Sequence, residues 1–252
     1  MCEVTPNAEQ IDHAERDLEG MYSGYPDKNR LQRYLSHPDK KTRLFRIIDE
    51  LGFDPTNVLE KFRFEVYGKF LGFDCPDLTA LPVPALQEGF NWILPIVAIH
   101  DKTPNEAIFQ EMKRQFGEKH DSEGGWKWTD DILDDIVTVN DRDPLKSGPY
   151  VIRTRDRKEA DEELKETSAV QLAERKIQCV TLYERQVMEA FYYVETGEHL
   201  DVENVTLCAG SRFSDGRVPR ACWYPYNRRF NVRWYGVEGS NDILRARQVV
   251  SI

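Results

Sequence analysis

The sequence predicts an α+β protein, in which a mainly helical N-terminal half precedes helices packed on a small, three- to four-stranded antiparallel sheet. Apolar residues of the first half recur at helical spacing. Two capping boxes open helices in the second half, and after residue 197 the apolar period changes from about 3.6 to about 2. We expect a helical region over residues 1–120 and an α+β region over 126–252, either as two domains or sharing one core.

The first half carries three helix signals. An apolar stripe at i, i+3, i+4 and i+7 spacing occurs at Leu44, Ile47, Ile48 and Leu51, and a second stripe, with a spacing of four, at Phe62, Val66 and Phe70. Asp54 and Pro55 between them are typical of a helix start, because proline needs no N–H at the first helical position. Thr103-Pro104-Asn105-Glu106 predicts a capping box that opens a helix ending near Phe116.

The middle of the chain alternates loops with short elements. The polar segment 117–125 ends in two glycines and predicts a long loop or hinge. A short helix is expected over 129–139 and a strand over 150–154. Two capping boxes follow, in which Ser168 pairs with Gln171 and Thr181 with Glu184, and Gly197 marks the end of the second helix.

The C-terminal segment predicts a three-stranded antiparallel meander. Residues 205–208, 218–224 and 229–235 alternate at the strand period, and Asp215-Gly216 is a hairpin signal between the first two. The strand at 150–154 could extend this sheet. In the last strand, Phe230, Val232 and Trp234 are expected on the core face.

Charge is distributed unevenly along the chain. The net charge is −10, yet residues 205–252 contain eight Arg, no Lys and three acidic residues, which gives +5 and leaves −15 for residues 1–204. An acidic protein is not expected to bind nucleic acid or membranes over its whole surface, so such binding would be local to the C-terminal segment. Five scattered cysteines predict neither disulfides nor a zinc site, and the start of the chain lacks signal-peptide features. We therefore expect a cytoplasmic protein without metal, cofactor or membrane anchor.

Strand alternation predicts a basic and aromatic face that contains Arg220, Tyr224, Arg229 and Arg233. Guanidinium groups and aromatic rings together can bind a carboxylate or phosphate or stack on bases. One interpretation is therefore a surface for an acidic protein or a phosphate-bearing ligand, and a second is nucleic-acid binding. A third is pairing within the molecule, because acidic helices could cover these arginines.

The turn around Ser211, Arg212 and Asp215 is a separate candidate for an anion site. Hydroxyl, guanidinium and backbone N–H groups can hold a phosphate or carboxylate, although serine, aspartate and glycine are also what a tight hairpin requires. His199 lies nearby in the sequence and could act there as an acid or base, which leaves an enzyme as an alternative. No catalytic motif is present. The sequence therefore favours a non-enzymatic binding protein.

Overall fold

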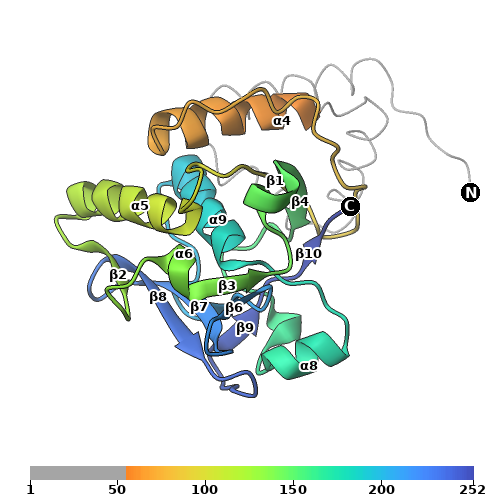
Figure 1. Ribbon diagram of the computed structural model, residues 1–252, viewed down its shortest axis with the longest axis vertical. Coiled ribbons are helices and arrows are strands. Elements are labelled where there is room, and N and C mark those ends of the chain that lie inside the picture. Colours follow the sequence, from red (N-terminus) through yellow and green to blue (C-terminus); the bar gives the residue numbers. More distant parts are fainter. Residues whose placement is uncertain (1–54) are drawn as a thin grey trace, which may run out of the picture. The chain divides into compact units, whose positions relative to one another are not determined.

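The computed structural model describes residues 55–252 (Figure 1). The described residues belong to one unit of the chain, Asp54–Ile252. The helix expected at Leu44–Leu51 and the Asp54 cap lie outside the described residues. The division into regions 1–120 and 126–252 stays a prediction.

Helices and strands mix throughout the described unit, which confirms the α+β class. The helices are α4 (Pro55–Lys61), the π-helix η1 (Phe62–Phe70), α5 (Pro104–His120), α6 (Leu133–Ile136), α7 (Pro144–Ser147), the 3-10 helix η2 (Glu162–Leu164), α8 (Ala169–Glu174) and α9 (Leu182–Thr196). Among residues 55–252, none of these helices has the length and apolar character needed to cross a membrane.

The strands form three sheets rather than one. A five-stranded mixed sheet has the order β2 (Gly124–Lys127), β8 (Arg229–Tyr235), β7 (Val218–Tyr224), β5 (Val205–Leu207) and β9 (Leu244–Ala246). A three-stranded sheet has the order β1 (Trp92–Ile96), β4 (Tyr150–Thr154) and β10 (Val249–Val250), and a two-stranded sheet pairs β3 (Val137–Asn140) with β6 (Ser211–Phe213).

The expected meander is present as the antiparallel strands β5, β7 and β8, but the predicted size of its sheet was wrong. β2 and β9 add parallel to its two outer strands, since β2 pairs with β8 and β9 with β5. β4 has the expected bounds, yet it lies in the other sheet between β1 and β10. The Asp215-Gly216 turn joins β6, not β5, to β7, and Gly216 has the positive φ of +85° that a tight turn requires.

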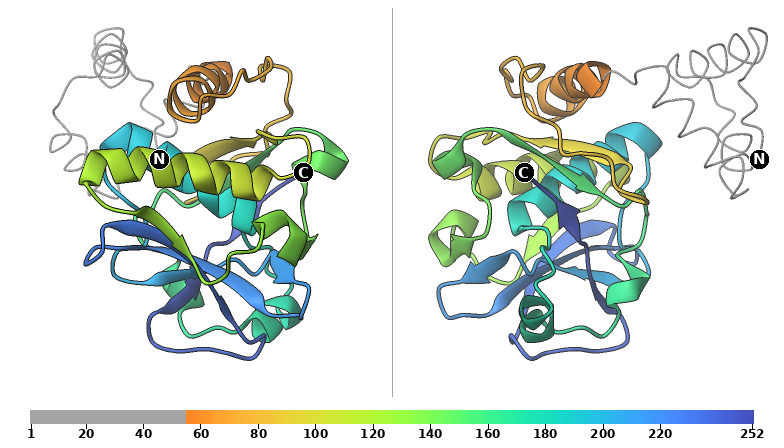
Figure 2. Two further views of the ribbon diagram at one scale, coloured as in Figure 1. Left: turned by 60° about the vertical axis from the view of Figure 1, so that its left-hand side comes forward. Right: turned by 90° about the vertical axis from the view of Figure 1, so that its right-hand side faces the viewer.

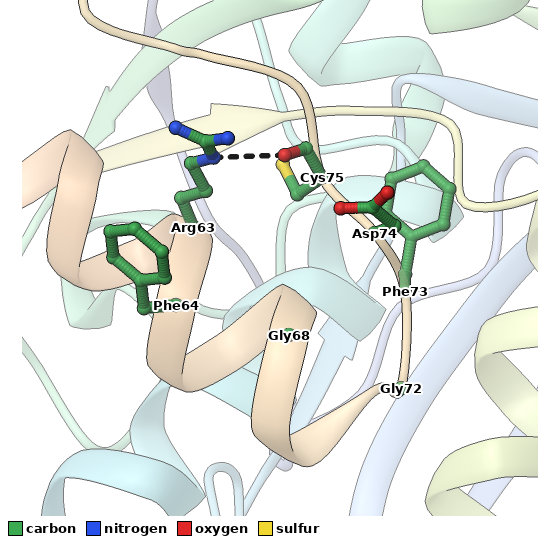
Figure 3. A pocket seen from close by; sticks show the side chains of 7 residues that line it. All are labelled: Arg63, Phe64, Gly68, Gly72, Phe73, Asp74 and Cys75. Atoms are coloured by element: carbon green, nitrogen blue, oxygen red, sulfur yellow. Dashed lines mark hydrogen bonds between the residues drawn. The ribbon is translucent and has the colours of Figure 1, made fainter.

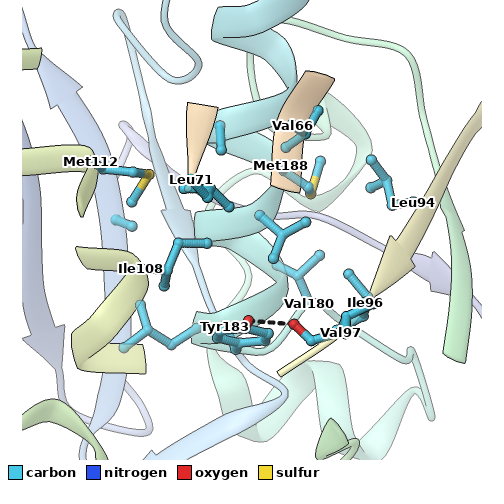
Figure 4. Packing of buried hydrophobic residues seen from close by; sticks show 14 of the residues in the cluster. Val66, Leu71, Leu94, Ile96, Val97, Ile108, Met112, Val180, Tyr183 and Met188 are labelled. Atoms are coloured by element: carbon cyan, nitrogen blue, oxygen red, sulfur yellow. Dashed lines mark hydrogen bonds between the residues drawn. The ribbon is translucent and has the colours of Figure 1, made fainter. Parts of the chain in front are cut away.

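Helix α9 is the centre of the main core. It runs between the β1-β4-β10 sheet and the five-stranded sheet, with α5 alongside (Figures 1 and 2). The Thr181–Glu184 capping box is formed and Gly197 ends the helix in the left-handed conformation, both as predicted. Apolar side chains from η1, β1, α5 and α9 interdigitate around it, including Val66, Ile96, Ile108 and Met188 (Figure 4).

A second apolar cluster covers one end of the five-stranded sheet on its other face. Helix α8 opens with the predicted Ser168–Gln171 capping box and buries Leu172. This side chain belongs to a cluster with Leu207 of β5, Val218 of β7 and Leu244 of β9. Cys222 of β7 and Tyr235 of β8 pack at the edge of this cluster, whereas Tyr224 and Arg233 on the same face are exposed.

The helix predicted over 129–139 was wrong. Helix α6 spans only Leu133–Ile136 and gives way at once to strand β3. The sequence of β3 is Val-Thr-Val-Asn, and β-branched residues favour strands over helices. Pairing with β6 at Phe213 fixes this choice.

The capping box predicted at Thr103 was also wrong, although α5 begins at Pro104 as expected. The Thr103 side chain makes no cap hydrogen bond and contacts His100 Nδ1 instead, at 3.1 Å. Asp134 takes its place, because its carboxylate accepts from the backbone N–H groups of Asn105 at 3.1 Å and Glu106 at 2.9 Å. A side chain 29 positions away in the sequence therefore caps this helix.

We predict that Asp134→Ala lowers the free energy of unfolding by about 1–2 kcal/mol, because two N–H groups of α5 lose their acceptor. The neighbouring exposed residue Asp135 provides the matched control, and Asp135→Ala should change stability by less than about 0.5 kcal/mol. Urea unfolding followed by tryptophan fluorescence measures both. Equal losses in the two variants would contradict the assignment of the cap to Asp134.

Candidate functional site: an arginine and aromatic sheet face

The residues predicted to share a sheet face are brought together by the register of β7 and β8. Arg220 lies opposite Arg233 and Tyr224 opposite Arg229. The opposite face of the same strands is the core face, where Phe230 and Val232 are buried, while Trp234 at its end is 41% exposed. Strand β2 adds Trp126, which lies beside Asn231. We call Trp126, Arg220, Tyr224, Arg229, Arg233 and Tyr235 the Arg face.

Aromatic rings hold the guanidinium groups of the Arg face in place. The guanidinium carbon of Arg233 lies 4.8 Å from the ring centre of Trp126, and that of Arg229 lies 5.5 Å from the same ring. Arg220 lies 4.9 Å from the ring of Tyr235. A guanidinium that is held over a ring keeps its N–H edge available, and this planar edge suits bidentate binding of an oxyanion.

Two of these arginines have no counter-charge among residues 55–252. Arg229 pairs with Glu123 at 2.5 Å, whereas Arg220 and Arg233 lie within ion-pair distance of no described carboxylate. Glu123 belongs to the loop before β2, so among residues 55–252 no acidic helix supplies a partner for this pair, as the third interpretation required. Like charges directly opposite each other on a sheet are destabilising. Arg220 and Arg233 therefore place two positive charges next to each other, and no described carboxylate neutralises them.

Partial burial of Arg220 raises the free-energy cost of holding its charge beside that of Arg233. Desolvation lowers the pKa of the half-buried Arg220, and the neighbouring charge of Arg233 lowers it further. The Nε atoms of Arg220 and Arg229 are buried and lack a hydrogen-bond partner among the described residues. An arginine remains protonated in proteins, so the charge persists, and an anion that approached this face would offset the cost.

The other arginines of the C-terminal segment have partners within the described unit. Arg247 pairs with Asp201 at 2.6 Å, Arg245 with Glu162 at 2.7 Å and Arg217 with Asp215 at 2.5 Å. Arg217 also lies over the rings of Trp128 and Trp234. This contrast distinguishes the Arg220 and Arg233 pair from the rest of the basic segment.

The turn at 211–216 lies apart from the Arg face, and its side chains have local structural contacts. Ser211 is 1% exposed, accepts from the backbone N–H of Leu182 at 2.9 Å and donates to Asn140 at 2.5 Å. Arg212 donates to the carbonyl oxygens of Ala209 and Ser211, both at 2.7 Å. Asp215 accepts from Arg217. These contacts position the start of α9 and the β6–β7 hairpin.

His199 has partners of its own. It bonds to His120 of α5 at 2.9 Å and to Glu189 of α9 at 2.8 Å, and its ring stacks on Trp223. Neither partner belongs to the 211–216 turn. No sequence pattern indicates the contact with His120, because the two histidines are 79 positions apart. Buried ion pairs lie behind His199. Their one local signal in the sequence is the i, i+4 spacing of Arg185 and Glu189 on α9.

Two small cavities lie beside the helices. One of about 270 Å³ lies beside η1, where Arg63 donates to the carbonyl oxygen of Cys75 (Figure 3). A second of about 250 Å³ lies between the start of α5 and α7 and includes Asn105 and Lys146. Both fall below the roughly 300–1,000 Å³ that is typical of pockets for small-molecule ligands.

Neither metal nor thiol chemistry has a visible centre in residues 55–252. No group of three or more His, Cys, Asp and Glu side chains in this range could hold a metal ion. Burial raises the pKa of the Cys75 and Cys179 thiols to about 12, which disfavours the nucleophilic thiolate.

The chain matches no protein-family model, no curated protein and no solved structure at a significant level.

Proposed function

We propose that the protein is a non-enzymatic binding protein whose Arg face engages an acidic segment of a partner protein. One observation carries the proposal: Arg220 and Arg233 lie opposite each other on adjacent strands, held over aromatic rings, with no carboxylate among the described residues to neutralise them. A carboxylate-bearing segment would supply the missing counter-charge through charge-assisted hydrogen bonds.

The surroundings of the pair favour a protein partner. Tyr224 is 52% exposed beside the arginines, and Tyr226 at the tip of the β7–β8 turn is 91% exposed. Tyrosine, tryptophan and arginine are the residues that most often dominate the energy of protein–protein interfaces. The rings of Trp126 and Tyr235 already carry guanidinium groups, which leaves fewer free platforms for nucleic-acid bases. The acidic net charge of −10 also opposes a polyanion as long as a nucleic acid.

Binding of a hexa-aspartate peptide, measured by fluorescence anisotropy at low salt, tests the proposal. We expect Arg220→Ala and Arg233→Ala each to weaken binding about tenfold or more, because each removes hydrogen bonds to a charged group. Arg229→Ala should have a smaller effect, since Arg229 already has Glu123 as a partner.

Arg114→Ala is the matched control for charge. Arg114 lies on α5, is exposed and pairs with Glu111 and Glu118. Its loss changes the net charge of the protein equally but should leave affinity unchanged. Equal effects of Arg114→Ala and Arg233→Ala would contradict a specific site. Tighter binding of single-stranded DNA than of the peptide, with the same arginine dependence, would replace the proposal by nucleic-acid binding.

A further inference from the structure

A chain of hydrogen bonds runs from the C-terminal end of α5 into the core. His120 Nε2 lies 2.9 Å from His199 Nε2, and His199 Nδ1 lies 2.8 Å from Glu189 Oε1. The other carboxylate oxygen of Glu189 accepts from Arg185 at 2.8 Å. Glu189 and Arg185 are fully buried and His199 is nearly so, whereas His120 is half-buried. Only the outer imidazole therefore has ready access to protons from solvent.

The direction of each hydrogen bond follows from the chemistry of the groups. An ionised carboxylate can only accept, so His199 donates its Nδ1–H to Glu189 and presents a bare Nε2 to His120. His120 must then donate its Nε2–H, which leaves its Nδ1 free to take a proton. A proton added to His120 Nδ1 charges this ring without breaking the chain of hydrogen bonds.

Charged or titratable groups face His120 from three elements. Lys119 lies next to it on α5, Arg228 lies in the β7–β8 turn, and His199 lies in the loop after α9. Burial lowers the pKa of His120, and His199, Arg228 and Lys119 lower it further. The negative end of the α5 helix dipole tends to raise the pKa of His120, but this contribution is smaller than those that lower it.

The inner imidazole faces aromatic rings and one acidic group. His199 stacks on Trp223 of β7 at 3.3 Å between ring centres, and Tyr193 of α9 lies at 5.0 Å. The charge of Glu189 is shared with Arg185, which also pairs with Asp201. His199 therefore lies against a buried group of balanced ion pairs.

The loop that directly follows His120 holds one arginine of the Arg face. Ser122 donates to the carbonyl oxygen of Arg228 at 2.7 Å, and Arg228 donates to the carbonyl oxygen of Asp121 at 3.3 Å. Glu123 then pairs with Arg229 at 2.5 Å. The position of His120 and the pairing of Arg229 thus depend on the same short loop.

We propose that the His120–His199 pair is an acid-sensitive clasp that keeps Arg229 paired with Glu123 at neutral pH and releases Arg229 on protonation. An imidazolium at His120 repels Arg228 and moves the turn away from the end of α5, so that the contacts of residues 121–123 loosen. The released guanidinium joins Arg220 and Arg233 for an anionic partner. This regulation rests on the function proposed above.

The sign of the pH dependence follows from the lowered pKa of His120. The unfolded chain takes up a proton near pH 6.5, before the folded protein does, so the unfolded state binds more protons between the two pKa values. The contribution of the neutral pair to stability is therefore complete above about pH 6.5 and is lost as the pH falls through the folded pKa.

Two measurements on the full chain test the clasp, with His120→Gln as the variant because its amide can still donate to His199 but does not titrate. In a pH titration followed by NMR, the amide signals of residues 121–123 and 228–229 should move together below about pH 6.5 in the wild type and stay in place in His120→Gln. Affinity for hexa-aspartate should rise about two- to fivefold from about pH 7.5 to 5.5 in the wild type alone. The released Arg229 can then pair with the peptide, and one surface ion pair contributes a gain of about this size. Glu123→Gln should reproduce this gain at about pH 7.5.

His100→Gln is the matched control, because His100 precedes the opposite end of α5 and its removal should leave the transition unchanged. Absence of the transition in the wild type, or its persistence in His120→Gln, would overturn the clasp. A transition with pH-independent peptide binding would overturn the regulation of the Arg face. A transition without peptide binding at either pH would confirm the clasp and refute the proposed function.

Discussion

Arg185→Ala is expected to lower the free energy of unfolding by about 3–5 kcal/mol, because it leaves buried carboxylates without their partner. Arg185 is 0% exposed and bonds to Glu189 and Asp201, both at 2.8 Å. Both acidic groups are also fully buried. Asp201 keeps Arg247 in the variant, whereas Glu189 keeps only His199. Most of the expected loss in the free energy of unfolding therefore comes from the buried charge of Glu189, which Arg185 no longer compensates.

Urea unfolding followed by tryptophan fluorescence measures this loss in the full chain. All five tryptophans lie between residues 92 and 234, so the signal reports on the described unit. The exposed ion pairs of Arg114 provide the comparison, and Arg114→Ala should cost less than about 1 kcal/mol. A loss below about 1 kcal/mol for Arg185→Ala as well would contradict the importance of the buried ion pairs.

Gly124→Ala is expected to cost about 3–5 kcal/mol, because a methyl group has no room at this position. A Cβ atom would overlap the backbone oxygen of Lys113 and the backbone nitrogen of Gly117, both in α5. Gly124 also has a φ of +69°, which disfavours any other residue. The variant should displace β2 and with it Trp126, so peptide binding to the Arg face should weaken too.

Gly216→Ala separates the steric overlap of an added methyl group from the backbone strain of a positive φ. Gly216 has a φ of +85° in the β6–β7 hairpin, but a Cβ atom there would meet nothing within 4 Å. Only backbone strain remains, and we expect a loss of about 1–2 kcal/mol. Equal losses in the two glycine variants would show that α5 and β2 are not packed as closely as described.

The elements that local sequence specifies were predicted well. The capping boxes of α8 and α9 are formed, and β7 and β8 have the expected bounds. In each case the signal and the structure lie within a few residues of each other. A serine or threonine that accepts from the third N–H of its own helix needs no distant partner. Strand alternation likewise needs only one buried face.

The elements that depend on distant residues were predicted poorly. Asp134 caps α5 from another element, and β3 is a strand because β6 pairs with it. β2 was interpreted as part of a loop, since Gly124 and Gly125 are poor strand formers. Its parallel pairing with β8 is compatible with glycine because α5 lies against its backbone. Such pairings follow from the packing of the whole unit.

The candidate site shows the same division. Alternation predicted that Arg220, Tyr224, Arg229 and Arg233 share a face, and the register places them there. Trp126, which carries two of the guanidinium groups, could not be predicted because its strand could not. That Arg229 has an acidic partner while Arg220 has none depends on where Glu123 lies in space.

The most direct test of the Arg face is an NMR titration of the protein with hexa-aspartate that follows the arginine Nε–H signals. Binding as proposed predicts that the signals of Arg220 and Arg233 shift and saturate together, while that of Arg114 does not move. Saturating peptide that leaves Arg220 and Arg233 unmoved, or shifts arginines over the whole surface alike, would contradict the proposal.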